Sequence, residues 1–176
     1  MLDKNLLLVD IGGTNIRYAY SNIGDSDFVS ENKAELDSLT NFDNLMSKLL
    51  AESNVKNIVF SVAGPKVNNS IKMTNRNFEI DAEALKQRFN LESCHLLNDW
   101  ESIGYSMKTF SENDFDNFKE GEPFNNTFLV VGPGTGLGAS VISGNNVIAT
   151  EIGNTNLGLS APVSYTHLTL PTSVLV

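Results

Sequence analysis

Short apolar runs that end at polar or glycine-containing turns recur along the chain and predict buried β-strands. In the amino-terminal part these runs are residues 5–11, 57–65 and 94–100. Residues 15–21 alternate apolar and polar side chains, which predicts a strand that pairs with the first around Gly12 and Gly13. Residues 28–36 are a candidate third strand of this group.

Two segments between these runs have the residue spacing of helices. Residues 39–53 place apolar side chains three and four positions apart. Residues 80–90 begin with Asp81, whose carboxylate can cap a helix. A further helix is expected from Glu101. Strands and helices that alternate in this way predict an α/β domain built of βαβ units.

The composition changes after residue 107. Residues 108–127 are acidic, rich in Asn and interrupted by Gly and Pro, which is typical of a connection between domains. Strand patterns then resume at 128–132, 139–144 and 146–153, with a hairpin turn at Gly144. We therefore expect a small α/β domain over 1–107, a linker over 108–127, and the first strands of a larger domain over 128–162.

Residues 163–176 continue neither pattern. They resemble the translated sequence of a sequencing adapter, and we expect them to be foreign to the fold. A genuine short strand and tail is the alternative. On the first interpretation the chain is a fragment.

The net charge restricts the partners. A charge of −9 over 176 residues, with a pI near 4.6, argues against binding to nucleic acid or to an anionic membrane. The lone Cys94 excludes an internal disulfide, and no apolar run approaches the roughly 18 residues of a membrane span. The start of the chain lacks the pattern of a signal peptide, so we expect a cytoplasmic protein. Any bound phosphate would have to be held by backbone amides and a metal ion.

The first candidate site follows the first strand. Asp10 ends a buried run and is followed by Gly12, Gly13 and Thr14, whose backbone amides could approach an anion closely. A Mg²⁺ ion between Asp10 and that anion would offset their repulsion, so this pattern indicates a metal–phosphate site. An ordinary Gly-Gly hairpin is the alternative.

The second candidate is the glycine-rich stretch 132–138. It lacks the Gly-Lys-Ser/Thr ending of a P-loop, and a β-branched hairpin follows where a dinucleotide fingerprint requires a helix. A hairpin loop that binds phosphate through Gly134, Thr135 and Gly136 fits better. Together with the first glycine turn, it would face the phosphates from the other side of a cleft.

The third candidate is Asn98-Asp99, at the end of a strand. Asp99 could take a proton from a substrate hydroxyl as it attacks a phosphoryl group, and Asn98 could bind neighbouring hydroxyls. Alternatively, Asp99 caps the next helix. Asn75, Glu151 and Asn154 are further candidate hydroxyl ligands, or plain loop residues.

Taken together, the motifs resemble those of bacterial glucokinases, within the hexokinase and actin superfamily. The matching stretches are LVDIGGTNIR, MTN, LLNDWESIGY, GPGTGLG, EIGN and LSAP, within residues 4–162. The resemblance implies an actin-like, ribonuclease H-like α/β fold with a mixed sheet, followed by the truncated start of a second α/β domain. It also implies ATP and Mg²⁺ as cofactors, phosphorylation of glucose or a similar hexose, and a homodimer of the full-length protein.

The same resemblance implies roles for individual residues. Asp10 would be the Mg²⁺-associated acid, Gly12, Gly13 and Thr14 the first phosphate loop, and 134–136 the second. Asp99 would be the general base for the sugar 6-hydroxyl. The implied sugar ligands are Asn75, Asn98, Asp99, Glu151 and Asn154.

Two departures from the family pattern matter. Asn154 stands where the family usually has a histidine that touches the sugar, which keeps a kinase for another hexose open. The rest of the large domain is missing, so we expect this chain to be inactive. A sugar-responsive regulator of the same fold is a further alternative, but the acidic charge and the lack of a DNA-binding helix pair before residue 5 disfavour it.

Overall fold

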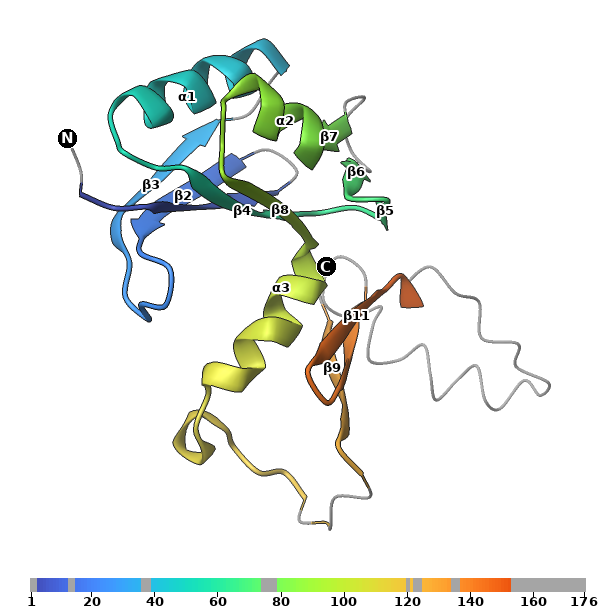
Figure 1. The fold of residues 1–176 in the computed structure, drawn as a ribbon. Coiled ribbons are helices and arrows are strands. Elements are labelled where there is room, and N and C mark those ends of the chain that lie inside the picture. Colours follow the sequence, from blue (N-terminus) through green and yellow to red (C-terminus); the bar gives the residue numbers. More distant parts are fainter. Residues whose placement is uncertain are drawn as a thin grey trace.

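A computed structural model describes most of the chain (Figure 1). The described residues are 3–12, 15–35, 39–73, 79–119, 121, 125–133 and 137–152. Within them no helix is long and apolar enough to cross a membrane.

A five-stranded mixed sheet forms the centre of the amino-terminal part. Its strands are β1 (Leu6–Ile11), β2 (Asn15–Ser21), β3 (Val29–Glu35), β4 (Asn57–Val62) and β8 (Ser93–Asn98). The strand order is β3-β2-β1-β4-β8. β1, β4 and β8 run parallel, whereas β2 and β3 pair antiparallel beside them. The predicted α/β fold with a mixed sheet is confirmed.

Helices α1 (Leu39–Ala51) and α2 (Ala82–Arg88) lie on the same side of this sheet (Figure 1). Every second residue of β1 and β4 is buried, and α1 buries residues four and three positions apart. This core includes Leu7, Ile11, Ile58, Phe60, Val62, Phe42, Met46 and Leu49. The two helices are joined by an ion pair of 2.7 Å between Arg88 Nη1 and Asp43 Oδ1. The apolar residues that alternate along the strands therefore pack against those at helical spacing in α1, in one core.

The predicted cap of the second helix is confirmed. Asp81 Oδ1 accepts a hydrogen bond of 2.7 Å from the Ala84 N–H, and α2 begins one residue later.

A small antiparallel sheet that the sequence pattern did not predict lies between β4 and α2 in the chain. It consists of β5 (Lys66–Val67), β6 (Ser70–Lys72) and β7 (Glu79–Asp81). Asn68 and Asn69 join β5 to β6, and their φ angles of 49° and 61° are those of a two-residue turn with both central residues left-handed. Asn tolerates this conformation, so the Asn-Asn pair was the available signal. The predicted strand 57–65 also ends early, at Val62.

The third helix, α3 (Asp99–Ser106), begins earlier than predicted. The expected strand 94–100 stops at Asn98, and the helix starts at Asp99 rather than at Glu101. The reason is a capping box between Asn98 and Glu101, which sets the first turn. The predicted linker contains two short 3₁₀ helices, η1 (Met107–Thr109) and η2 (Glu112–Asp114).

A second sheet of order β11-β10-β9 follows (Figure 1). Its strands are β9 (Thr127–Pro133), β10 (Leu137–Ser143) and β11 (Asn146–Thr150), all antiparallel. The predicted turn at Gly144 is confirmed, with φ of 58°. α3 packs on one face of this sheet. The expected foreign tail, 163–176, lies outside the described residues.

Candidate functional site

The site residues of the first sheet gather where its parallel strands end. The register aligns Ile11 with Val62 and Val62 with Asn98, so β1, β4 and β8 finish side by side. Asp10 and Asp99 are thereby brought to one edge of the sheet from distant parts of the chain. Such an edge is where open α/β sheets bind ligands.

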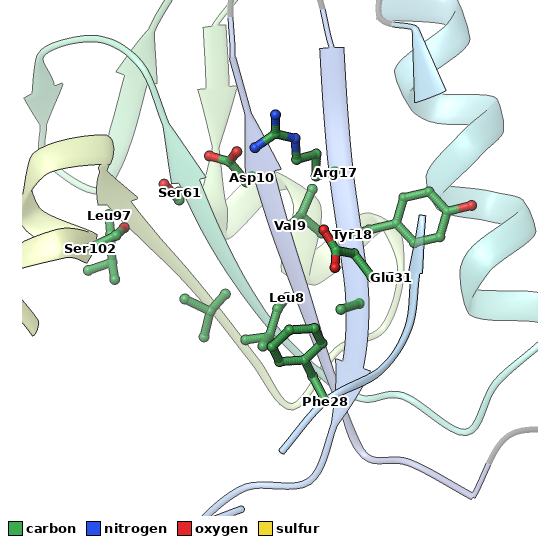
Figure 2. A pocket seen from close by; sticks show the side chains of 12 residues that line it. Leu8, Val9, Asp10, Arg17, Tyr18, Phe28, Glu31, Ser61, Leu97 and Ser102 are labelled. Carbon is green, nitrogen blue, oxygen red and sulfur yellow. The ribbon is translucent and has the colours of Figure 1, made fainter. Parts of the chain in front are cut away.

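A pocket of about 340 Å³ opens beside this edge. Figure 2 shows Asp10 and Arg17 at one end of it and Phe28 toward the other, with Leu8 between them. Asp10 and Arg17 are direct partners in the β1–β2 pair, so their opposite charges lie side by side. The pocket therefore combines charged side chains, those of Asp10, Arg17 and Glu31, with apolar side chains such as Leu8 and Phe28.

Gly12 is placed differently from the expectation. Its N–H donates to the Asn15 carbonyl at 3.0 Å and closes the turn between β1 and β2, rather than pointing to an anion. Among the described residues, a Cβ at Gly12 would meet only the Asn15 carbonyl oxygen, at 3.8 Å. Gly13 and Thr14 lie outside the described residues.

Asn98 is buried and has its side chain fixed by three contacts. Its Oδ1 accepts hydrogen bonds from the backbone N–H of Trp100 at 2.9 Å and of Glu101 at 3.3 Å. Its Nδ2 donates to the Gly64 carbonyl at 2.8 Å. Gly64 has φ of 150°, and a Cβ there would lie 2.6 Å from the Lys72 carbonyl oxygen. Asn98 is therefore both the cap of α3 and a brace between β8 and the end of β4.

Because Asn98 is the cap, Asp99 is not, and the alternative reading of Asp99 as the capping residue is wrong. Asp99 is the first residue of α3 and is partly buried. Burial raises the pKa of its carboxyl, and the nearby charge of Asp10 raises this pKa further. A hydrogen bond of 2.9 Å from the Trp100 N–H to Asp99 Oδ1 opposes that rise. The net effect is a carboxylate more basic than an ordinary Asp.

Glu101 stabilises the turn that carries Asn98 and Asp99, and it was not among the expected site residues. Glu101 Oε2 accepts the Asn98 N–H at 3.1 Å, and both Glu101 carboxylate oxygens lie 3.3 Å from Lys66 Nζ. The Asn-x-x-Glu spacing of a capping box was visible in the sequence, but the ion pair with Lys66 was not. Glu101 ties the start of α3 to β5.

Two further titratable side chains, Cys94 and His95, are not among the residues that line this pocket. Cys94 is buried, and burial raises its pKa to about 12, which disfavours the reactive thiolate. His95 is exposed on β8.

The remaining expected site residues are mostly outside the described residues. These are Asn75, Gly134, Thr135, Gly136 and Asn154, together with Gly13 and Thr14. Glu151 is described and exposed, directly after β11.

Among the described residues, no three His, Cys, Asp or Glu side chains are grouped to hold a metal ion. A Mg²⁺ ion bound to phosphates needs only one or two protein carboxylates. Asp10 fits that lesser role, because it is exposed and close enough to Asp99 for their charges to interact.

The chain matches a known protein family and several of its members. The family model described as Glucokinase matches residues 7–169. The glucokinase of Nostoc punctiforme is 30% identical over 150 residues, which are 80% of this chain and 44% of that protein. This chain thus spans less than half the length of the curated relatives it matches.

Two solved structures share the fold. A glucokinase from an Antarctic psychrotroph aligns with a TM-score of 0.71 and 25% identity, over 96% of this chain and 56% of that one. A ROK-family glucokinase from Streptomyces griseus, in complex with glucose and AMPPNP, aligns with a TM-score of 0.60 and 18% identity. That alignment covers 89% of this chain and 48% of the other, and at this identity it shows that the two proteins share the fold.

Proposed function

Because the chain belongs to the glucokinase family, we propose that it forms the amino-terminal part of an enzyme that phosphorylates glucose with ATP. The observation that carries this proposal is the position of Asp99. It is a carboxylate of raised basicity at the ends of parallel strands, with its capping duty taken over by Asn98. The side chain is therefore available to a substrate.

In this reaction Asp99 accepts the proton of the sugar 6-hydroxyl as that oxygen attacks the γ-phosphorus of ATP. The phosphoryl group passes to the sugar oxygen, and ADP leaves. The raised pKa helps, since a general base works best when its pKa lies nearer the working pH. The Trp100 N–H orients the carboxylate by its bond to Oδ1.

Phosphate binding is assigned to the two glycine turns and Asp10. Gly13 and Thr14 would supply amides, since the Gly12 N–H closes the turn. Gly134, Thr135 and Gly136 would hold the phosphates from the second sheet. A Mg²⁺ ion associated with Asp10 would neutralise charge on the phosphates. The AMPPNP in the Streptomyces griseus enzyme, an ATP analogue, supports ATP as the donor.

Sugar binding is assigned to Asn75, Asn98, Asp99, Glu151 and Asn154. The Asn98 amide donates to the Gly64 carbonyl and also hydrogen-bonds the Asp99 carboxylate, so it holds the carboxylate beside the proposed sugar position. The glucose in the Streptomyces griseus complex supports a hexose. Because Asn154 stands where the family usually has a histidine that touches the sugar, other hexoses should be tested as substrates. A cytoplasmic location, a homodimer and the absence of nucleic-acid or membrane partners stay predictions.

The test measures glucose-dependent ADP formation. The chain is extended with the part of the Nostoc punctiforme enzyme that lies beyond the matched region. Asp99→Ala should lower kcat by roughly 10²-fold or more, the usual cost of losing a general base. Asp116→Ala, which removes an exposed acid after η2, is the matched control and should leave kcat unchanged. Near-normal turnover of Asp99→Ala would refute the role, and preferential turnover of another hexose would redirect the substrate.

A further inference from the structure

The indole ring of Trp100 lies on a pair of glycines in the second sheet. Gly132 of β9 and Gly138 of β10 are direct cross-strand partners. A Cβ added at Gly132 would lie 2.0 Å from Trp100 Cη2, and one added at Gly138 would lie 1.6 Å from Trp100 Nε1. Both positions must therefore be glycine for the ring to lie there. We call this contact the tryptophan seat.

The seat links the two parts of the proposed site. The backbone N–H of Trp100 donates to the Oδ1 atoms of Asn98 and Asp99, each at 2.9 Å. The ring of the same residue contacts β9 and β10 at Gly132 and Gly138, the first and last residues of the glycine-rich stretch 132–138. One residue thus orients the Asp99 carboxylate with its backbone and contacts the β9–β10 hairpin with its side chain.

A second close contact holds the other end of α3. A Cβ at Gly104 would lie 2.5 Å from Val147 Cγ1 and 2.7 Å from Ser140 Oγ, so the helix backbone approaches the sheet directly. A helix held at two points against a sheet can neither slide nor rotate without a clash. α3 and the second sheet should therefore move together.

From this geometry we propose that Trp100 is a positioning residue, whose seat on Gly132 and Gly138 sets the place of Asp99 relative to the β9–β10 hairpin. The inference rests on the proposed function, and it extends that function by one residue that touches no substrate. A misplacement of about 1 Å at a reacting group can cost on the order of 10²-fold in rate. Loss of the ring should therefore reduce turnover more than sugar affinity.

The seat itself is tested first, in the 176-residue chain without ligand. Trp100 is the sole tryptophan, so intrinsic emission reports on it alone. Gly138→Ala forces the ring out, and the emission maximum should move to longer wavelength. Gly121→Ala is the control, because none of the described residues lies within 4 Å of a Cβ at that position. Identical emission from the Gly138→Ala variant and the native chain would overturn the seat.

Kinetics of the extended chain then test positioning. Trp100→Ala should lower kcat by roughly 10- to 100-fold with the glucose KM changed less than about threefold. Trp100→Phe should restore most of the rate, because a ring can still lie on the glycines. Gly138→Ala should lower kcat in the same way while it retains the tryptophan. This second variant therefore tests positioning even if Trp100→Ala fails to fold.

The possible failures are distinguishable. Native kcat in Trp100→Ala, or in Gly138→Ala with shifted emission, overturns positioning and leaves the proposed function intact. A rise in glucose KM with unchanged kcat also overturns it, since that pattern belongs to sugar binding. An unsubstituted extended chain that phosphorylates no hexose overturns both proposals, whatever the emission shows.

Discussion

Asn98 and Asp99, adjacent polar residues where β8 ends and α3 begins, have different roles. Asn98 is buried, and its side chain hydrogen-bonds the first turn of α3 and the Gly64 carbonyl. Asp99 accepts a hydrogen bond from the Trp100 N–H at its carboxylate, and its pKa is raised by burial and by Asp10. The amide therefore supplies the structure around the site, and the carboxylate is held ready for proton transfer at a cost in stability.

That cost is measurable as a dependence of the folding stability on pH. The folded-state pKa of Asp99 is raised, so between the unfolded and folded pKa values the folded protein binds more protons than the unfolded one. The stability contributed by protonated Asp99 is thus lost as pH rises through this window. Asp99→Asn removes the titration and keeps an oxygen for the Trp100 N–H. The variant should melt at a higher temperature than the native chain at pH 7.

The difference in melting temperature between Asp99→Asn and the native chain should become smaller as the pH is lowered toward the ordinary carboxyl pKa. Thermal denaturation across pH 4 to 7 measures this difference. Asp116→Asn, at an exposed position, should show no such gap and serves as the control. An Asp99→Asn variant less stable than the native chain at pH 7 would contradict the assigned cause of the shift.

At the scale of elements, α3 is a short helix whose stability depends on its ends. Helices of this length are marginal without tertiary support. The capping box closes its first turn, and the Lys66 ion pair anchors that turn to β5. Trp100 and Gly104 hold its face on the second sheet. Sequence propensity alone would not maintain this helix.

Glu101→Ala should therefore destabilise the fold by about 2 kcal/mol, because it removes charge-assisted hydrogen bonds to the Asn98 N–H and the Lys66 ammonium. Glu101→Gln keeps the capping bond and loses the ion pair, so it should cost less. Urea denaturation measures both variants against Glu112→Ala, which removes an exposed acid from η2. A loss of less than about 0.5 kcal/mol in Glu101→Ala, the range of ordinary surface changes, would argue against the role.

At the scale of the whole molecule, the two sheets are covered unequally. The first sheet has α1 and α2 over one face and a continuous apolar core. The second sheet has α3 on one face. On its other face Leu129, Val131, Leu137 and Ile148 are 46 to 57% exposed. The second sheet therefore buries less apolar area for each strand it orders.

This difference predicts a gradient of local stability. Backbone amides of β1 and β4, which have paired strands on both sides, should exchange with deuterium slowest. Amides of β9 and β11, the outer strands of the second sheet within the described residues, should exchange fastest among the strands. Hydrogen exchange read by mass spectrometry or NMR measures this order. Equal protection of β4 and β9 would contradict it.

Local patterns in the sequence determined most of the elements. Apolar runs predicted β1 and β4, alternation of period two predicted β2, helical spacing predicted α1, and Asp81 predicted the start of α2. These succeed because the deciding interactions lie within a few residues of one another. The Asn-Asn turn was equally local, but the two strands that it joins are too short and polar to show a period.

Tertiary structure decided how the site is assembled. The sequence supplied Asp10, Asn98 and Asp99 as polar residues at strand ends. Only the parallel register of β1, β4 and β8 brings these ends to one edge. The glycines of 132–138 indicated a phosphate loop, yet Gly132 and Gly138 serve the ring of Trp100. No local pattern could reveal this, because the contact joins segments far apart in the chain and depends on how α3 packs on the second sheet.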